Sequence, residues 1–201
     1  MRLARPALAA SILLALAGPA AWAQNLVTNA HFDTNVNSWT PWLINGGLLA
    51  WSPLDWAGNP SSGSGLMTND SSFSGTRFYR VSNCITAPTT GTYEYGAHIR
   101  IPGGQTTGGS AAVSLVLWDL PGCSGNSGGG INPAAIVSTA TTDVWVPILI
   151  QGLSLNAGRS VQLALSVMKS QAGGTLSVHF DFARFGLDGT TPVELLELEI
   201  E

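Results

Sequence analysis

The sequence predicts an all-β protein, an antiparallel β-sandwich, and three observations lead to this prediction. Charged residues are only 10% of the 201 residues. The polar residues are mostly Ser, Thr, Asn and Gly, which suit strands and turns better than helix surfaces. Apolar and polar residues alternate in several short segments, and glycine-rich clusters separate them. Many short strands with turn signals between them are typical of a sandwich.

Three segments alternate strictly, with one apolar face: Thr92–Ile101, Ser160–Met168 and Leu176–Phe182. Three others are further strand candidates, the first two of them more continuously apolar: Ala112–Trp118, Val144–Ile150 and Tyr79–Ile85. Period-two alternation indicates a strand with one buried face, and apolar runs fit central strands. Glycine-rich turns are expected between them, Gly128–Gly130 included, and the polar segment Gly58–Ser72 predicts a long loop.

The first 23 residues have the layout of a secretory signal peptide. Arg2 and Arg5 precede the apolar run Ala7–Ala17, and Ala21-Trp22-Ala23 offers small residues where a signal peptidase cuts. The run is too short to span ~30 Å of hydrocarbon, so a signal peptide is favoured over an anchor. We therefore expect cleavage after Ala23, one sandwich domain over 24–187, a tail or edge strand over 188–201, and an extracellular or periplasmic location.

The charge of the mature chain argues against a nucleic-acid partner. Loss of Arg2 and Arg5 leaves six of the eight basic residues against twelve acidic ones, a net charge of −6. Such a chain lacks the basic footprint that phosphate backbones require. No later segment is long and apolar enough for a membrane span.

The two cysteines, Cys84 and Cys123, predict one disulfide. An even cysteine count in an exported chain favours pairing, because the compartment is oxidising. One bridge supports a fold of this size, and a hydrophobic core must still provide most of the stability.

Short motifs near both ends of the mature chain resemble the galactose-binding-like jelly-roll family, which includes xylan- and glucan-binding carbohydrate-binding modules. The first motif is Asn25–Asp33 followed by Ser38-Trp39-Thr40, and the last is Val178–Phe185. Two positions depart from the usual pattern, because Ala30 stands where Gly is common and Phe182 where a second Asp is common. The resemblance implies a jelly-roll sandwich. It also implies a structural calcium shared by Asp33 and Asp181, with Asp55 as a weaker third ligand. Calcium prefers six to eight oxygen ligands, and carboxylates from separate segments suit it.

Tryptophans are the best candidates for ligand binding. The mature chain has six, four of them between Trp39 and Trp56. Aromatic planes bind the apolar faces of sugar rings, while amides and charged groups bind the hydroxyls. Trp39 matches a core position of the family, and Trp118 and Trp145 lie in apolar strands, so these three are expected in the core. Trp42, Trp51 and Trp56 are the predicted glycan-binding platform.

No catalytic constellation is predicted. Gly125–Gly129 resembles the nucleophile loop of serine proteases, with Ser127 as nucleophile, but that chemistry needs a His base oriented by an Asp. His98 and Asp119 precede Ser127 by only 29 and 8 residues. Glycoside hydrolysis needs a pair of facing carboxyl groups, and no paired-acid strand motif is present.

The sequence therefore favours a secreted, non-catalytic protein that binds a polysaccharide or other glycan. Two alternatives stay open: a structural or adhesive sandwich with a protein partner, and a hydrolase whose site is not evident. In the tail, apolar and acidic residues alternate from Leu196 to Glu201, which favours an edge strand. A helix competes with it, since Leu and Glu are good helix formers.

Overall fold

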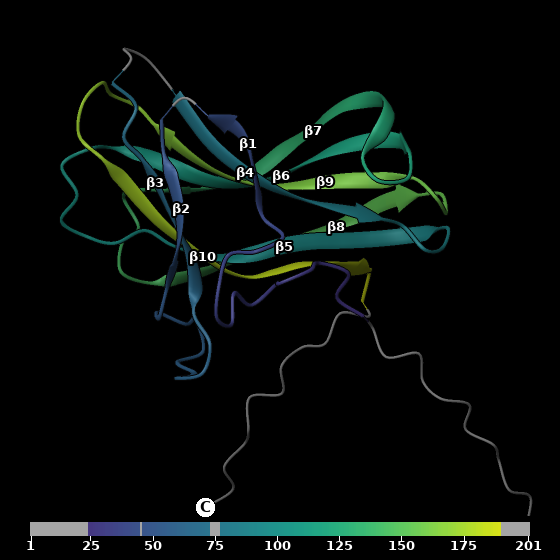
Figure 1. Cartoon of the computed structure of the whole chain (residues 1–201), viewed down its shortest axis with the longest axis horizontal. Coiled ribbons are helices and arrows are strands. Elements are labelled where there is room, and N and C mark those ends of the chain that lie inside the picture. The colour runs from purple at the N-terminus through teal and green to yellow at the C-terminus, as the bar shows by residue number, and fades with distance from the viewer. Residues whose placement is uncertain (1–23, 45, 73–76, 190–201) are drawn as a thin grey trace, which may run out of the picture.

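The computed structural model describes residues 24–44, 46–72 and 77–189, and these form two five-stranded sheets without a helix. Sheet A contains, in spatial order, β1 (Thr40–Ile44), β4 (Arg77–Thr86), β9 (Ser160–Lys169), β6 (Gly109–Leu120) and β7 (Ser124–Ser138). Sheet B contains β2 (Leu48–Ser52), β3 (Ser64–Asn69), β10 (Leu176–Leu187), β5 (Gly91–Arg100) and β8 (Trp145–Leu155). All neighbours pair antiparallel, so the predicted sandwich is confirmed (Figure 1).

Six of the strands match the predicted segments, and two of the predicted breaks are wrong. The expected loop Gly58–Ser72 contains β3, and the expected turn Gly128–Gly130 lies inside β7. In β3, a Cβ at Gly65 would come within 2.8 Å of the Phe32 ring. Glycine is therefore needed there for close packing within a strand, and it does not mark a break.

The core lies between the two sheets, and each central strand contributes alternate residues to it. Two ring pairs stack within this layer, Tyr93 on Phe185 at 5.1 Å and Phe32 on Trp39 at 5.4 Å between centroids. Trp39 is buried, as predicted, and its indole N–H donates to the Asn29 carbonyl at 3.1 Å. Stacked rings of this kind add to the free energy of area burial.

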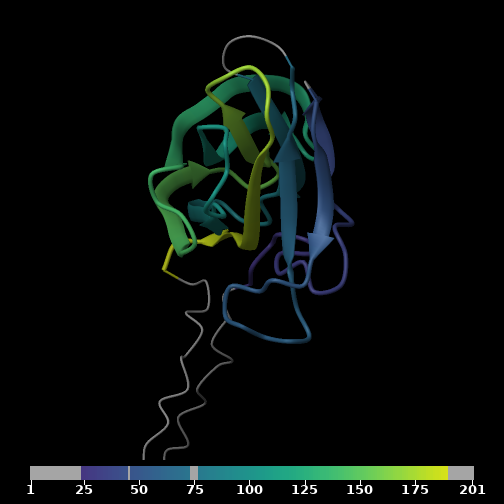
Figure 2. The same ribbon diagram turned by 90° about the vertical axis from the view of Figure 1, so that its left-hand side faces the viewer.

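The N-terminal segment, residues 25–39, bonds to strands of both sheets. The Leu26 N–H donates to the Phe185 carbonyl in β10 at 2.8 Å. The Asn83 side-chain amide in β4 donates to the Thr28 carbonyl at 2.9 Å. The beginning and the end of the described chain consequently lie side by side, in purple and yellow (Figures 1 and 2).

The predicted disulfide between Cys84 and Cys123 is present. It connects β4 with the turn between β6 and β7. The predicted signal peptide, residues 1–23, and most of the predicted tail, residues 190–201, lie outside the described residues. Across the described part of the chain, no helix is long and apolar enough to cross a membrane.

Candidate functional site

The outer face of sheet A carries a set of polar side chains that bond to one another across its strands. Core packing takes Val81, Leu165 and Val113 from its three central strands. Because side chains alternate between the two faces of a strand, the intervening residues point outward. We call this surface the β4–β9–β6 face. Its outward residues lie opposite one another across the three strands in four rows: Arg80, Ser166 and Ala112; Ser82, Ala164 and Ser114; Cys84, Gln162 and Val116; and Ser160 with Trp118.

Two long polar side chains lie over the small residues of this face. The Arg80 Nε–H donates to Ser166 Oγ, and the Gln162 amide donates to Ser82 Oγ, both at 2.9 Å. Burial lowers the pKa of the Arg80 guanidinium from its ordinary value, although the group stays charged. The Gln162 Oε1 atom is buried and has no hydrogen-bond partner among the described residues. A buried acceptor without a partner points to water or a ligand as its missing donor.

A cavity of about 410 Å³ adjoins Gln162 at the side of the face next to β1. Its lining is polar and comes from the N-terminal segment, β1, β4 and β9: Thr28, Ser38, Thr40, Pro41, Ser82, Asn83, Cys84 and Gln162. A concave site with a few convergent polar groups is the usual form of a ligand-binding site.

Trp118 stands at the end of the β4–β9–β6 face opposite Arg80, in the row next to Gln162. It was expected in the core, and that expectation is wrong, because Leu117 is the neighbour that packs inward. Trp118 is half-buried, and its indole N–H is buried without a partner in the described chain. Sequence reasoning missed Arg80, Gln162 and Trp118. The alternation of Ala112, Ser114, Val116 and Trp118 is the signal that could have placed Trp118 outside.

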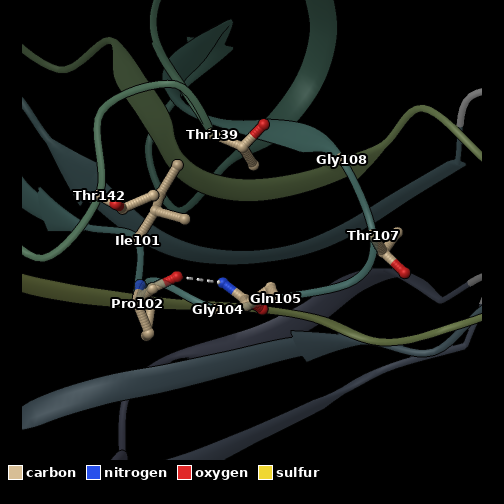
Figure 3. A pocket seen from close by; sticks show the side chains of 8 residues that line it. All are labelled: Ile101, Pro102, Gly104, Gln105, Thr107, Gly108, Thr139 and Thr142. Carbon is tan, nitrogen blue, oxygen red and sulfur yellow. Dashed lines mark hydrogen bonds between the residues drawn. The ribbon is translucent and has the colours of Figure 1, made fainter.

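The cavity in Figure 3 is a weaker candidate. It measures about 190 Å³ and lies among the loops that follow β5 and β7. The Gln105 amide, its main polar group, already donates to the carbonyls of Pro102 and Ser177, and its oxygen accepts the Ser177 N–H. These bonds leave this amide little capacity for a ligand.

The three predicted platform tryptophans lie against different elements. Trp42 is in β1, and its side chain lies outside the described part of the structure. Trp51 is in the edge strand β2, where its indole N–H donates to the Phe32 carbonyl at 2.7 Å while 40% of the residue stays exposed. Trp56 lies in the loop between β2 and β3, with its ring stacked on His98. Trp51 therefore lies in a strand and Trp56 in a loop, so they do not form one regular row of side chains. Their roles in binding stay predictions.

Trp56 belongs to an aromatic cluster on the outer face of sheet B. Its ring lies 4.1 Å from His98 and 5.7 Å from Phe182, between centroids, and His31 lies 4.9 Å from Phe182. Burial lowers the pKa of His98 to about 4, and the positive charges of Arg184 and His31 add to this effect. His98 is only 9% exposed, because the loop that carries Trp56 covers it.

The predicted calcium ligands lie behind this cluster. Asp181 is fully buried, and its oxygens accept the backbone N–H groups of Trp56 at 3.0 Å and Phe182 at 2.6 Å. Burial raises the pKa of Asp181 to about 8; these hydrogen bonds oppose the shift, and repulsion from Asp55 and Asp33 adds to it.

These carboxylates meet calcium's preference for oxygen ligands only in part. Asp55 already accepts two backbone N–H groups at 2.8 Å, and Asp33 accepts the Ser62 hydroxyl at 3.1 Å. Within the described residues, no three acidic, His or Cys side chains form a group that could hold a metal ion. Calcium at Asp33 and Asp181 stays a prediction, and it would need backbone carbonyls as further ligands.

The protease-like residues do not come together. Ser127 lies on β7 opposite Trp118 in sheet A, whereas His98 lies on β5 in sheet B. The Asp119 carboxylate accepts both the backbone and side-chain N–H groups of Asn126 at 2.8 and 3.2 Å. These three residues therefore do not build a nucleophile, base and orienting acid.

No protein-family model and no curated protein sequence matches this chain. Its structure resembles a family 61 carbohydrate-binding module in complex with β-1,4-galactotriose, with a TM-score of 0.52 and 16% identity over 81% of this chain and 97% of that one. The chain has the fold of carbohydrate-binding modules. The promiscuous-specificity modules of the β-sandwich superfamily are also similar, with a TM-score of 0.54 and 14% identity over 80% of this chain and 61% of theirs.

A third structure that matches in part is the enzymatically active domain of bacteriophage CBA120 tailspike protein 4. It has a TM-score of 0.55 and 12% identity, over 81% of this chain and 21% of that one. This chain therefore spans only part of the last two proteins. Likeness at these identities confirms the predicted jelly-roll fold, and function must be argued from the site.

Proposed function

We propose that this chain is a secreted, non-catalytic carbohydrate-binding protein, and that the β4–β9–β6 face is its main glycan-binding surface. Secretion is supported by the signal-peptide pattern of residues 1–23 and by the disulfide. The fold shared with carbohydrate-binding modules supports a glycan ligand.

One observation carries the placement of the glycan. Two buried polar atoms on this face, Gln162 Oε1 and Trp118 Nε1, have no hydrogen-bond partner among the residues the structure describes. One is an acceptor and the other a donor, so together they complement hydroxyl groups, which both donate and accept. The cavity beside Gln162 and the Arg80 guanidinium add further polar contacts along the same strands.

The proposed chemistry is binding alone. Sugar hydroxyls would accept from the Trp118 N–H and donate to the Gln162 oxygen, while the half-buried Trp118 ring would contact an apolar sugar face. The outward residues of this face include no carboxylate, so it lacks the acid pair that glycoside hydrolysis needs.

The test is affinity electrophoresis of the purified full chain in gels that contain soluble β-glucan, xyloglucan, arabinoxylan or galactan. We expect retardation by at least one polysaccharide. Gln162→Leu and Trp118→Phe should each weaken it by about tenfold, because a ligand hydroxyl would lose its partner. Gln171→Leu, in an exposed loop, is the matched control and should bind normally. Undiminished binding by both site variants would reject the β4–β9–β6 face as the binding surface.

A further inference from the structure

The outer face of sheet B, on the opposite side of the sandwich, carries a second group of unsatisfied polar atoms. His98 in β5 is 9% exposed, and its Nδ1 atom is buried without a partner in the described chain. The Nε atom of Arg184 in β10 is also buried and has no hydrogen-bond partner among the described residues. The two residues lie close together because β5 and β10 are paired. His98 lies opposite Asp181, and Gly96, two residues before His98, lies opposite Arg184. Two neighbouring groups of this kind point to a ligand that supplies the missing partners.

Apolar surfaces surround these two groups. The Trp56 ring stacks on His98 at an interplanar angle of 14° and is half-buried, so part of its surface stays accessible. Leu149 in β8 pairs with Gly96 and is 43% exposed. The Arg184 guanidinium lies 5.7 Å from the Phe182 ring centroid, which holds it over the cluster. An aromatic plane next to hydrogen-bonding groups is the arrangement that suits a sugar ring.

The charges around this surface favour a neutral ligand. Burial lowers the pKa of Arg184 from its ordinary value, and the attraction of the nearby Glu94 carboxylate opposes this shift. Glu94 in turn accepts the Gln151 amide at 2.9 Å, and the same amide donates to Asp188 at 2.8 Å. An anionic ligand would meet these two carboxylates, and a cationic ligand would meet Arg184. A ring with uncharged hydroxyl groups avoids both repulsions.

We propose that the outer face of sheet B is a second sugar-binding site, in which a neutral glycosyl residue contacts Trp56 and Leu149 and bonds to His98 and Arg184. A hydroxyl would accept from the Arg184 Nε–H, and another would exchange a hydrogen bond with His98 Nδ1. This goes beyond the β4–β9–β6 face, because the two surfaces lie on opposite sheets. One molecule would then bridge two polysaccharide chains.

The test is titration calorimetry with a short oligosaccharide of whichever neutral polysaccharide retards the full chain, alongside turbidity with the intact polysaccharide. The wild type should bind two oligosaccharides and make the polysaccharide solution turbid. Arg184→Met keeps an apolar side chain over Phe182 and removes the N–H donor. It should bind one oligosaccharide, with at least a tenfold loss at the other site, and cause no turbidity. Trp56→Ala should do the same, and Gln171→Leu should behave as the wild type.

The outcomes separate this proposal from the proposed function. One site in the wild type, lost in Gln162→Leu and unchanged in Arg184→Met, overturns the second site and leaves the first. One site lost in Arg184→Met and unchanged in Gln162→Leu supports the sheet B site and overturns the placement on sheet A. Absence of binding to every probe overturns both. Melting curves show which variants are folded. If Trp56→Ala does not fold, Arg184→Gln replaces it as the second variant of the sheet B site.

Discussion

The backbone N–H of Trp56 donates to the Asp181 carboxylate at 3.0 Å, across 125 positions of sequence. This bond holds the loop between β2 and β3 against β10, in the place where Trp56 can cover His98. A buried acid therefore fixes the position of an aromatic ring that the sequence indicates only as a possible binding residue.

Calcium dependence is the first prediction from this arrangement. If Asp33 and Asp181 share calcium, added calcium should raise the melting temperature of the wild type, since a ligand that binds the folded state stabilises it. Asp181→Asn removes the carboxyl group that would ionise to bind calcium, so the melting temperature of this variant should not respond. Asp119→Asn, an exposed acid in sheet A, is the control and should respond as the wild type. An equal calcium response in all three proteins would contradict the site.

Acid should destabilise the fold through His98 and His179. Burial lowers both pKa values to about 4, with Arg184 and His31 contributing for His98 and Arg100 for His179. The unfolded chain takes up a proton at each His below its ordinary pKa of 6.5, whereas the folded chain does not. The stability that these two histidines contribute is therefore fully present above pH 6.5 and is lost as the pH falls toward 4.

Between pH 7 and pH 5 each histidine should cost about 2 kcal/mol of unfolding free energy. Urea denaturation at the two pH values measures the loss, and a His98→Gln, His179→Gln double variant should lose about 4 kcal/mol less than the wild type. The same pH dependence in both proteins would show that these groups do not govern it.

The disulfide should contribute substantially to stability. Replacing Cys84 and Cys123 by Ser opens a loop whose ends are separated by 39 positions. We expect a loss of roughly 3–4 kcal/mol, because the unfolded chain regains the entropy of that loop. Thermal denaturation should show a melting temperature lower by about 10 °C. Wild-type protein under reducing conditions should match the variant, and a smaller loss than about 1 kcal/mol would contradict the expectation.

Lys169 should stabilise the end of the sandwich where the segments around Ser71 and Gly174 meet. Its ammonium group is buried and donates to the Ser71 carbonyl at 2.7 Å and the Gly174 carbonyl at 2.6 Å. Lys169→Met keeps the chain length and leaves both carbonyls without this donor. The free energy of unfolding should fall by about 1–3 kcal/mol in urea titrations. An unchanged or raised midpoint would show that removing the buried charge outweighs the lost bonds.

Alternation predicted the strands that bury one regular face, such as β5, β9 and β10. It failed for β3 and β7, which contain glycines that usually mark turns. In β3 the reason is steric. Gly65 has no side chain and so leaves room for the ring of Phe32, which is 33 positions earlier in the chain. A local sequence pattern cannot reveal which glycine is needed to make room for a ring from a distant part of the chain.

The candidate sites were less predictable than the fold. Gln162 and Trp118 meet on one face through the pairing of β6 with β9, which the sequence does not encode as a motif. Trp56 was predicted as a binding residue, yet it lies in a loop and its stacking partner His98 comes from β5, which is distant in the sequence. The outward direction of Trp118 depends on which half of an apolar run faces the core, and composition alone leaves that choice open.

The bond between Leu26 and Phe185 has a consequence for how the protein is made. These residues lie 159 positions apart, and each sheet takes strands from both halves of the chain. During synthesis the N-terminal segment lacks this partner until β10 has been made, so this part of the sandwich forms last. Folding dominated by such distant pairings is slow. A nascent chain that stays open until its final strand appears is well suited to crossing a membrane before it folds.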